Sequence, residues 1–264
     1  MSAGYTLGVD ALRDALGRRI VPVLVVICVL SIMALDSCTS CAPAQIEVNG
    51  VPQTLEGLPG GMSLLTLVVL GLWVIVLAGI LSADHLRNTL EEGYASLALS
   101  RPVSRTSYAF ARLAGALGVA LGVGALLLAA ASYLVAVRAG LPLTPVLGSS
   151  LACVLGAVTV GALSMTLSLH LPRLPSVLLV FAAVGVIALA NLLGATRVDP
   201  GGWLSAIDQW GPPLAAGLAA PLQDWLPADY TRLDSGPLFL RLLFWSAIAL
   251  FQLGFEFRRL EIRG

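Results

Sequence analysis

Residues 62–82 read MSLLTLVVLGLWVIVLAGILS and contain no charged side chain. A transmembrane helix needs about 20 consecutive apolar residues to cross about 30 Å of hydrocarbon, and this stretch meets that requirement. Five further apolar stretches lie at residues 20–35, 113–137, 146–169, 177–193 and 238–255. The first and the fifth of the six are close to the lower length limit. The sequence therefore predicts one all-α integral membrane domain, residues 1–264, with six transmembrane helices.

The composition of the chain agrees with this prediction. Of the 264 residues, 58% are hydrophobic and 11% are charged, whereas soluble domains carry about 25% charged residues. The formal net charge is zero, so the total charge does not indicate a nucleic-acid partner and we expect none. The lipid bilayer is the expected surrounding.

All fifteen basic residues are arginines, and their distribution predicts the orientation in the membrane. Cytoplasmic loops of membrane proteins carry an excess of Lys and Arg. If both termini are cytoplasmic, eleven of the fifteen arginines lie on the cytoplasmic side. The four on the other side are Arg138, Arg197, Arg232 and Arg241. We therefore expect a multi-pass protein of the inner or plasma membrane with both termini in the cytoplasm.

Residues 1–19 have the pattern of an amphipathic helix, with Leu12 and Leu16 on one face and Arg18 and Arg19 at the membrane edge. Such a helix lies in the membrane interface rather than crossing the bilayer. The alternative is a solvated N-terminal extension.

Two long extracytoplasmic loops are predicted, at residues 36–61 and 194–237. The first contains Asn49-Gly50, a dipeptide that favours a tight β-hairpin. The second contains three tryptophans among prolines, and tryptophan concentrates where lipid meets water. We expect this second loop to form short helices that dip into the outer interface or lie on it. A loop folded around a small core of its own is the alternative.

Cys38 and Cys41 form a CTSC in the first of these loops. On the extracytoplasmic side a disulfide persists, so a disulfide within the loop or to a partner is one interpretation. Metal binding is the other, although two ligands are fewer than a tetrahedral soft-metal site requires.

The predicted spans contain few polar groups. Asn191 is a lone strongly polar residue in the fifth, and Arg241 lies close enough to the outer edge of the sixth to extend toward water. Proton-coupled transporters, voltage sensors and ion pumps hold charged groups at depth, so the sequence disfavours these classes. Small residues at four-residue spacing, Gly118/Gly122 and Ala152/Gly156 among them, favour close helix packing within the chain over a dimer seam.

Residues with catalytic chemistry are scarce. His85 and His170 lie at the inner membrane edge, where local hydrogen bonding is the expected role. The chain has no lysine, and a phosphate-binding P-loop requires one. We therefore expect no enzymatic activity in this chain: no catalytic residue, no cofactor-binding residue and no metal site.

Residues 83–112, ADHLRNTLEEGYASLALSRPVSRTSYAFAR, form the longest polar interruption on the cytoplasmic side. Asn88 and Thr89 are expected to cap a helix that begins near Leu90. Pro102 ends that helix because the residue before a proline is driven from helical angles. Ser104 is expected to cap a second helix that continues into the third span. The predicted result is a short helix held across the inner surface between two spans.

The order of residues in this loop resembles the first cytoplasmic loop of ABC-transporter permeases of the type-2 exporter (ABC-2) class. In that family an acidic–Gly element, an apolar helical turn, a Ser-Arg-Pro-x-Ser-Arg element and a Tyr/Arg-containing start of the third span recur in this order. The corresponding residues here are Glu91, Glu92, Gly93, Leu97, Leu99, Ser100, Arg101, Pro102, Ser104, Arg105, Tyr108 and Arg112. The six spans, the interfacial N-terminal helix and the arginine-rich tail also look like that family.

The resemblance implies that the short helix couples the spans to a separate ATPase subunit. The residues to which it assigns this coupling are Glu91, Glu92, Gly93, Leu97, Leu99, Arg101, Pro102, Ser104 and Arg105. The implied partners are two copies of an ABC ATPase, which would bind ATP and Mg, and a second permease that is either identical or different.

Two alternatives stay open. The arginines of this loop could serve topology alone, although that role does not explain the helix–proline–helix order. The protein could also be a non-transporting membrane anchor or assembly factor for an extracytoplasmic complex. The sequence does not identify a cargo, but uncharged spans fit a lipid-like or amphipathic molecule better than a bare ion.

Overall fold

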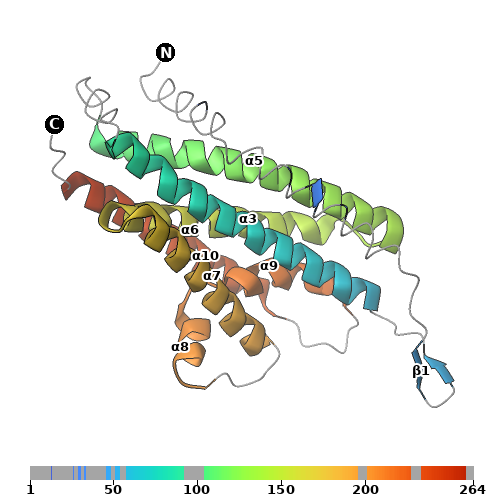
Figure 1. Cartoon of the computed structure of the whole chain (residues 1–264). Helices are drawn as coiled ribbons and strands as arrows, with labels where there is room; N and C mark the ends of the chain where they lie inside the picture. Colours follow the sequence, from blue (N-terminus) through green and yellow to red (C-terminus); the bar gives the residue numbers. More distant parts are fainter. Residues whose placement is uncertain are drawn as a thin grey trace.

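The computed structural model describes residues 46–48, 51–53, 58–91, 104–195, 201–226 and 233–259, together with the single positions Arg13, Val26, Val29, Leu30 and Met33. Helices dominate the described chain (Figure 1). The long helices are α3 (Leu58–Glu91), α5 (Arg105–Ala139), α6 (Thr144–His170), α7 (Arg173–Ala195) and α10 (Ser235–Arg259). The short elements are β1 (Ile46–Val48), β2 (Val51–Gln53), α8 (Gly202–Trp210), α9 (Leu214–Leu222) and the 3-10 helix η1 (Gln223–Trp225).

Within the described ranges, five helices are long and apolar enough to cross a membrane. They cover Ser63–Ala83, Arg105–Val137, Thr144–His170, Leu174–Ala195 and Ser235–Arg259. These five correspond to five of the six predicted spans. Most of the remaining span, residues 20–35, lies outside the described residues, although Val26, Val29, Leu30 and Met33 within it are helical. The interfacial helix predicted for residues 1–19 likewise lies outside them, except for the helical and exposed Arg13.

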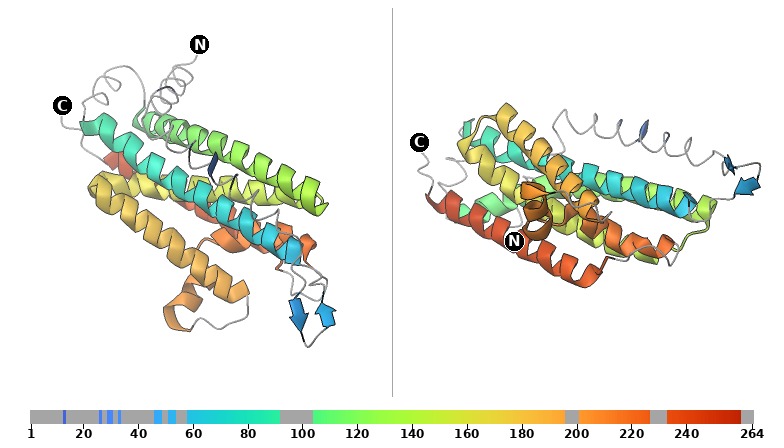
Figure 2. Two further views of the ribbon diagram at one scale, coloured as in Figure 1. Left: turned by 45° about the vertical axis from the view of Figure 1, so that its right-hand side comes forward. Right: turned by 90° about the horizontal axis from the view of Figure 1, so that it is seen from below.

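The long helices run along one another and alternate in direction, so the bundle has two distinct ends (Figures 1 and 2). We call one the arginine end, because Arg105, Arg112, Arg258 and Arg259 lie there. The other is the tryptophan end, which carries α8, α9 and η1 with Trp203, Trp210 and Trp225. Helix α6 is central, because α3, α5, α7, α9 and α10 all pack against it.

Small residues on α6 permit this central position. A Cβ added at Gly156 would lie 2.6 Å from the Cδ1 atom of Ile75 on α3, and one at Gly161 would lie 3.0 Å from the Ser82 hydroxyl. At Gly122 on α5, by contrast, an added Cβ meets no described atom within 4 Å. Close packing within the chain is therefore confirmed for the small residues of α6.

The turn between α5 and α6 follows from its sequence. Gly140 ends α5 in the left-handed conformation, with φ of 63°, and its N–H donates to the Ala136 carbonyl. A residue without a Cβ adopts this conformation at little cost. Pro145 then lies in the first turn of α6, where its missing N–H costs no helical hydrogen bond.

The predicted hairpin around residues 49 and 50 is confirmed by its two strands. β1 and β2 pair antiparallel, with Ile46 opposite Gln53 and Val48 opposite Val51. This register leaves two residues for the turn, the length that Asn-Gly favours.

The segment between the fifth and sixth predicted spans forms short helices, as expected. Helix α9 lies inside the bundle, where Leu214, Leu218 and Leu222 are fully buried against the long helices. Backbone at membrane depth is tolerated where protein surrounds it, and α6, α7, α3 and α10 provide those surroundings. The buried side chains therefore belong to the main core and not to a separate loop core.

Candidate functional site at the arginine end

The arginine end brings together the last turn of α3, the first turn of α5, the α6–α7 turn and the last turns of α10. Residues 92–103 connect α3 to α5 at this end. Of the predicted coupling residues, Glu91 ends α3, Ser104 caps α5 and Arg105 begins it. Those that lie outside the described residues are Glu92, Gly93, Leu97, Leu99, Arg101 and Pro102.

Ser104 caps α5 as the sequence predicts. Its backbone is extended, with φ of −68° and ψ of 142°, and its hydroxyl oxygen accepts a hydrogen bond of 3.1 Å from the Ser107 N–H. The Ser107 hydroxyl lies 2.7 Å from the same oxygen. A side-chain cap satisfies an N–H group that the helix itself leaves without a partner. The cap thus fixes where the connection ends and α5 begins.

The predicted cap at Asn88 and Thr89 is wrong. Both residues lie inside α3, which continues to Glu91, so no separate helix begins near Leu90. The reason is that residues 84–91 contain no glycine or proline, and helix formers such as leucine and arginine continue the span without a break. α3 thereby extends eight residues beyond Ala83, the end of its apolar part, or about 12 Å at about 1.5 Å per residue.

Tyr108 joins α5 to α10 at this end. Its side chain is 1% exposed, and its ring stacks on that of Phe257 with centroids 6.3 Å apart and an angle of 25° between the planes. The Arg112 guanidinium lies 5.4 Å from the Tyr108 ring centroid, and its Nε donates a hydrogen bond of 3.2 Å to the Tyr108 hydroxyl. The Tyr108 side chain therefore packs against an aromatic ring and also contacts a cation.

A second contact between α5 and α10 lies one turn away. A Cβ added at Gly254 would lie 3.4 Å from the Phe110 ring and 4.0 Å from Thr106. α10 then ends with Arg258 and Arg259 in its last turn, where basic side chains complement the helix dipole. The Arg259 guanidinium lies 4.0 Å from the Phe255 ring centroid. The first turns of α5 and the last turns of α10 are consequently fixed to each other.

His170 ends α6 at the same end of the bundle. Its Nε2 lies 3.7 Å from a carboxylate oxygen of Glu256 on α10. Both side chains are partly exposed, and such pairs contribute little to stability. The contact agrees with the local role expected for His170.

The tryptophan end has a polar cluster that sequence spacing did not reveal. The Asn191 amide on α7 donates a hydrogen bond of 3.1 Å to the carboxylate of Asp208 on α8. The Arg241 guanidinium on α10 donates a hydrogen bond to the Asp208 backbone carbonyl. The Trp245 indole N–H donates to the Trp210 carbonyl. Arg241, expected at the membrane edge, thus directs its guanidinium to α8. These bonds attach α8 to the end of α7 and to the first half of α10, where Arg241 and Trp245 lie.

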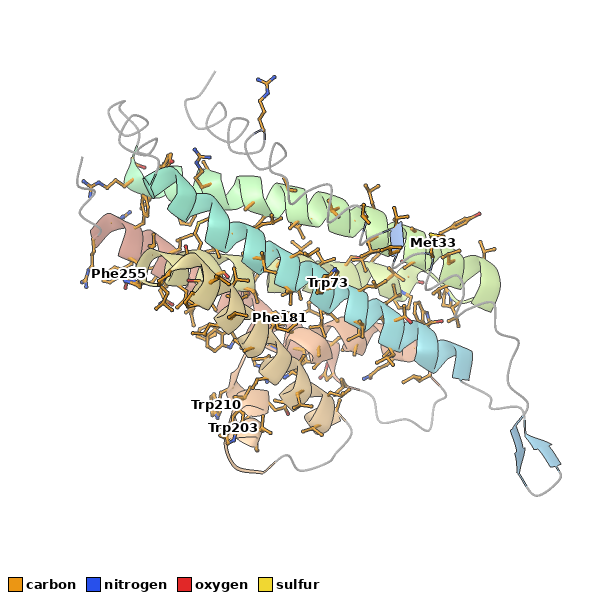
Figure 3. All side chains as sticks on the ribbon, in the orientation of Figure 1. Met33, Trp73, Phe181, Trp203, Trp210 and Phe255 are labelled. Carbon is orange, nitrogen blue, oxygen red and sulfur yellow. The ribbon has the colours of Figure 1, made fainter. Side chains whose placement is uncertain are left out.

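Helix α8 has no buried residue. Trp203 and Trp210 are 63% and 73% exposed, and both lie on α8 outside the bundle of long helices (Figure 3).

The disulfide and the metal site considered for Cys38 and Cys41 both stay predictions, because the two cysteines lie outside the described residues. Within the described ranges, no group of three or more His, Cys, Asp or Glu side chains is arranged to hold a metal ion. Cys153 is buried and free, with its sulfur 3.7 Å from the Gly71 carbonyl oxygen.

Comparison of the chain with models of protein families finds no match, and comparison with curated protein sequences finds no significant relative. The resemblance of residues 83–112 to ABC permeases therefore stays a prediction.

Proposed function

We propose that this chain is the membrane-spanning permease subunit of an ABC exporter, driven by a separate ATPase that binds ATP and Mg. The observation that carries the proposal is the arrangement around residues 92–103. This connection joins an extended α3 to a capped α5, and α5 is fixed to α10 through Tyr108 and Phe257. A force applied to the connection therefore reaches three spans.

In this mechanism the ATPases close when they bind nucleotide and displace residues 92–103 on the cytoplasmic side. Because α5 and α10 are packed together at this end, we expect them to move as a unit. Movement of packed helices relative to one another is a common form of switching. The exporter contains two ATPase copies and a second permease, either a copy of this chain or a similar one.

The charge distribution supports the proposal. Cytoplasmic placement of residues 92–103 puts eleven of the fifteen arginines on the same side as the ATPase. The chain has no lysine for a P-loop of its own. Energy for transport would therefore come from a partner.

Co-purification tests this proposal. The tagged chain, isolated from its native membrane, is expected to bring down a P-loop ATPase with nucleotide hydrolysis activity. Glu91→Ala and Arg101→Ala should lower that activity, whereas Arg197→Ala, predicted to lie on the opposite side, should not. The proposal fails if no ATPase is recovered, or if neither of the first two substitutions changes the activity.

A second function, membrane anchoring of an extracytoplasmic complex, is favoured by α8. This helix presents Trp203 and Trp210 and is attached to α7 and α10 through Asp208. Replacing both tryptophans by serine separates the two functions. Loss of a co-purifying extracytoplasmic protein on this double substitution, together with the recovery of no ATPase, would favour the anchor.

A further inference from the structure

A cavity of about 300 Å³ lies between α6, α7 and α10. Helices α7 and α10 both pack against α6, and the cavity occupies the space between them. This volume is at the lower end of the range for small-molecule sites, about 300–1,000 Å³. The cavity therefore has room for one narrow ligand.

The walls of the cavity are apolar over most of its length. Leu163 and Leu167 of α6 face Leu179, Val180 and Ile187 of α7. The lining residues of α6 extend from Thr159 to His170, about 16 Å along the helix at about 1.5 Å per residue. This length accommodates the extended chain of a dodecyl amphiphile.

One end of the cavity is polar and charged. His170, Gln252 and Glu256 line it at the arginine end. Glu256 is the only carboxylate among the described residues that line the cavity, and its side chain is 31% exposed. A carboxylate oxygen of Glu256 lies 3.7 Å from the Nε2 atom of His170. A carboxylate at the mouth of an apolar cavity is complementary to a cationic group at the end of an apolar chain.

We propose that this cavity binds a single-chain amphiphile with an ammonium headgroup. The headgroup lies at Glu256 and Gln252, and the chain runs along α6 and α7 toward Pro212. The proposal concerns binding alone, so it stands or falls independently of any ATPase.

Photo-cross-linking of the full chain in nanodiscs tests the proposal. Two dodecyl probes with the same diazirine at the end of the chain are compared, one with an ammonium headgroup and one with a hydroxyl group. Adducts of the ammonium probe are expected on α6 and α7 residues that line the cavity. Glu256→Gln should reduce labelling by the ammonium probe roughly fivefold, the upper end for a partly exposed ion pair, and leave the alcohol probe unchanged.

A filling variant separates the cavity from the lipid-facing surface. Ala183→Trp places an indole in the cavity and should abolish specific labelling by both probes. Ala182 and Ala183 are both exposed, but Ala182 does not line the cavity, so Ala182→Trp should leave labelling intact. Equal labelling of the two tryptophan variants, or equal loss of both probes in Glu256→Gln, would overturn the proposal. Thermal unfolding midpoints confirm that each variant is folded.

Discussion

At the scale of single residues, Tyr108 links two helices that are far apart in the sequence. Its ring fills the space between α5 and α10 beside Phe257, and its hydroxyl accepts a hydrogen bond from Arg112. The ring and the hydroxyl therefore make separate contributions, which substitution can resolve.

Tyr108→Ala is expected to destabilise the protein by about 3 kcal/mol, because it leaves a cavity where a fully buried ring was. Tyr108→Phe keeps the ring and should cost only about 1 kcal/mol, the loss of one hydrogen bond. Thermal unfolding in detergent measures both. A midpoint for Tyr108→Ala that is no lower than that of Tyr108→Phe would contradict the packing described here.

A buried hydroxyl pair connects α6 to α10 in the middle of the bundle. The Thr159 and Ser246 hydroxyl oxygens lie 2.9 Å apart. The Ser246 hydroxyl also lies within hydrogen-bond distance of two carbonyl oxygens, those of Leu155 at 3.1 Å and Leu242 at 2.8 Å. Hydrogen bonds between transmembrane helices average about 0.6 kcal/mol. A double-mutant cycle of Thr159→Val and Ser246→Ala should give a coupling energy of that size. A coupling energy of zero would show that the two hydroxyl groups do not bond to each other.

At the scale of elements, the apolar stretches of the sequence predicted the five described spans well. The reason is that the length and hydropathy of a stretch are sufficient to identify a span, without knowledge of tertiary contacts. The asparagine–glycine dipeptide predicted the hairpin for the same reason. Ser104 was identified as a cap because its role depends on the next three residues alone. The end of α3 was misplaced because Asn88 and Thr89 suit a cap by residue type, yet residues 84–92 contain no glycine or proline that would end the helix before them.

Features that depend on tertiary packing were not predicted from the sequence. The sequence of α9 is short and almost wholly apolar, so it does not show whether the helix is buried in the bundle or lies on the membrane interface. Phe257 lies far from Tyr108 in the chain, and Asp208 lies 17 and 33 residues from its partners Asn191 and Arg241. None of these contacts leaves a local signal.

The packing of α3 on α6 makes a prediction with a matched control. Gly156→Ala places a Cβ 2.6 Å from Ile75, and overpacking of this kind costs about 1–3 kcal/mol. Gly122→Ala meets no described atom within 4 Å and should gain up to about 1 kcal/mol from helix propensity. Unfolding midpoints should therefore move in opposite directions. Equal shifts for the two variants would contradict the close approach of the helices.

The cap of α5 is testable at the same scale. Ser104→Ala removes the acceptor for the Ser107 N–H and should cost about 1 kcal/mol, whereas Ser104→Asp should restore the cap. The rate of amide hydrogen exchange at residues 105–108 measures how well the cap holds the first turn of α5. Exchange in Ser104→Ala as slow as in the unsubstituted chain would show that the cap does not hold this turn.

At the scale of the whole molecule, the described part of the chain forms a bundle of long apolar helices with two different ends. The tryptophan end carries short helices held by polar side chains, and the arginine end carries the connection between α3 and α5. The proposed transport function requires that the arginine end faces the cytoplasm and contacts an ATPase. Both requirements concern residues 92–103.

Site-specific cross-linking in the native membrane tests this claim most directly. A photoreactive amino acid replaces Leu97 in the connection or, as a control, the exposed Leu143 in the α5–α6 turn at the tryptophan end. The account predicts an adduct with a P-loop ATPase from position 97 and none from position 143. Absence of an ATPase adduct at position 97, or an equal yield from both positions, would contradict it.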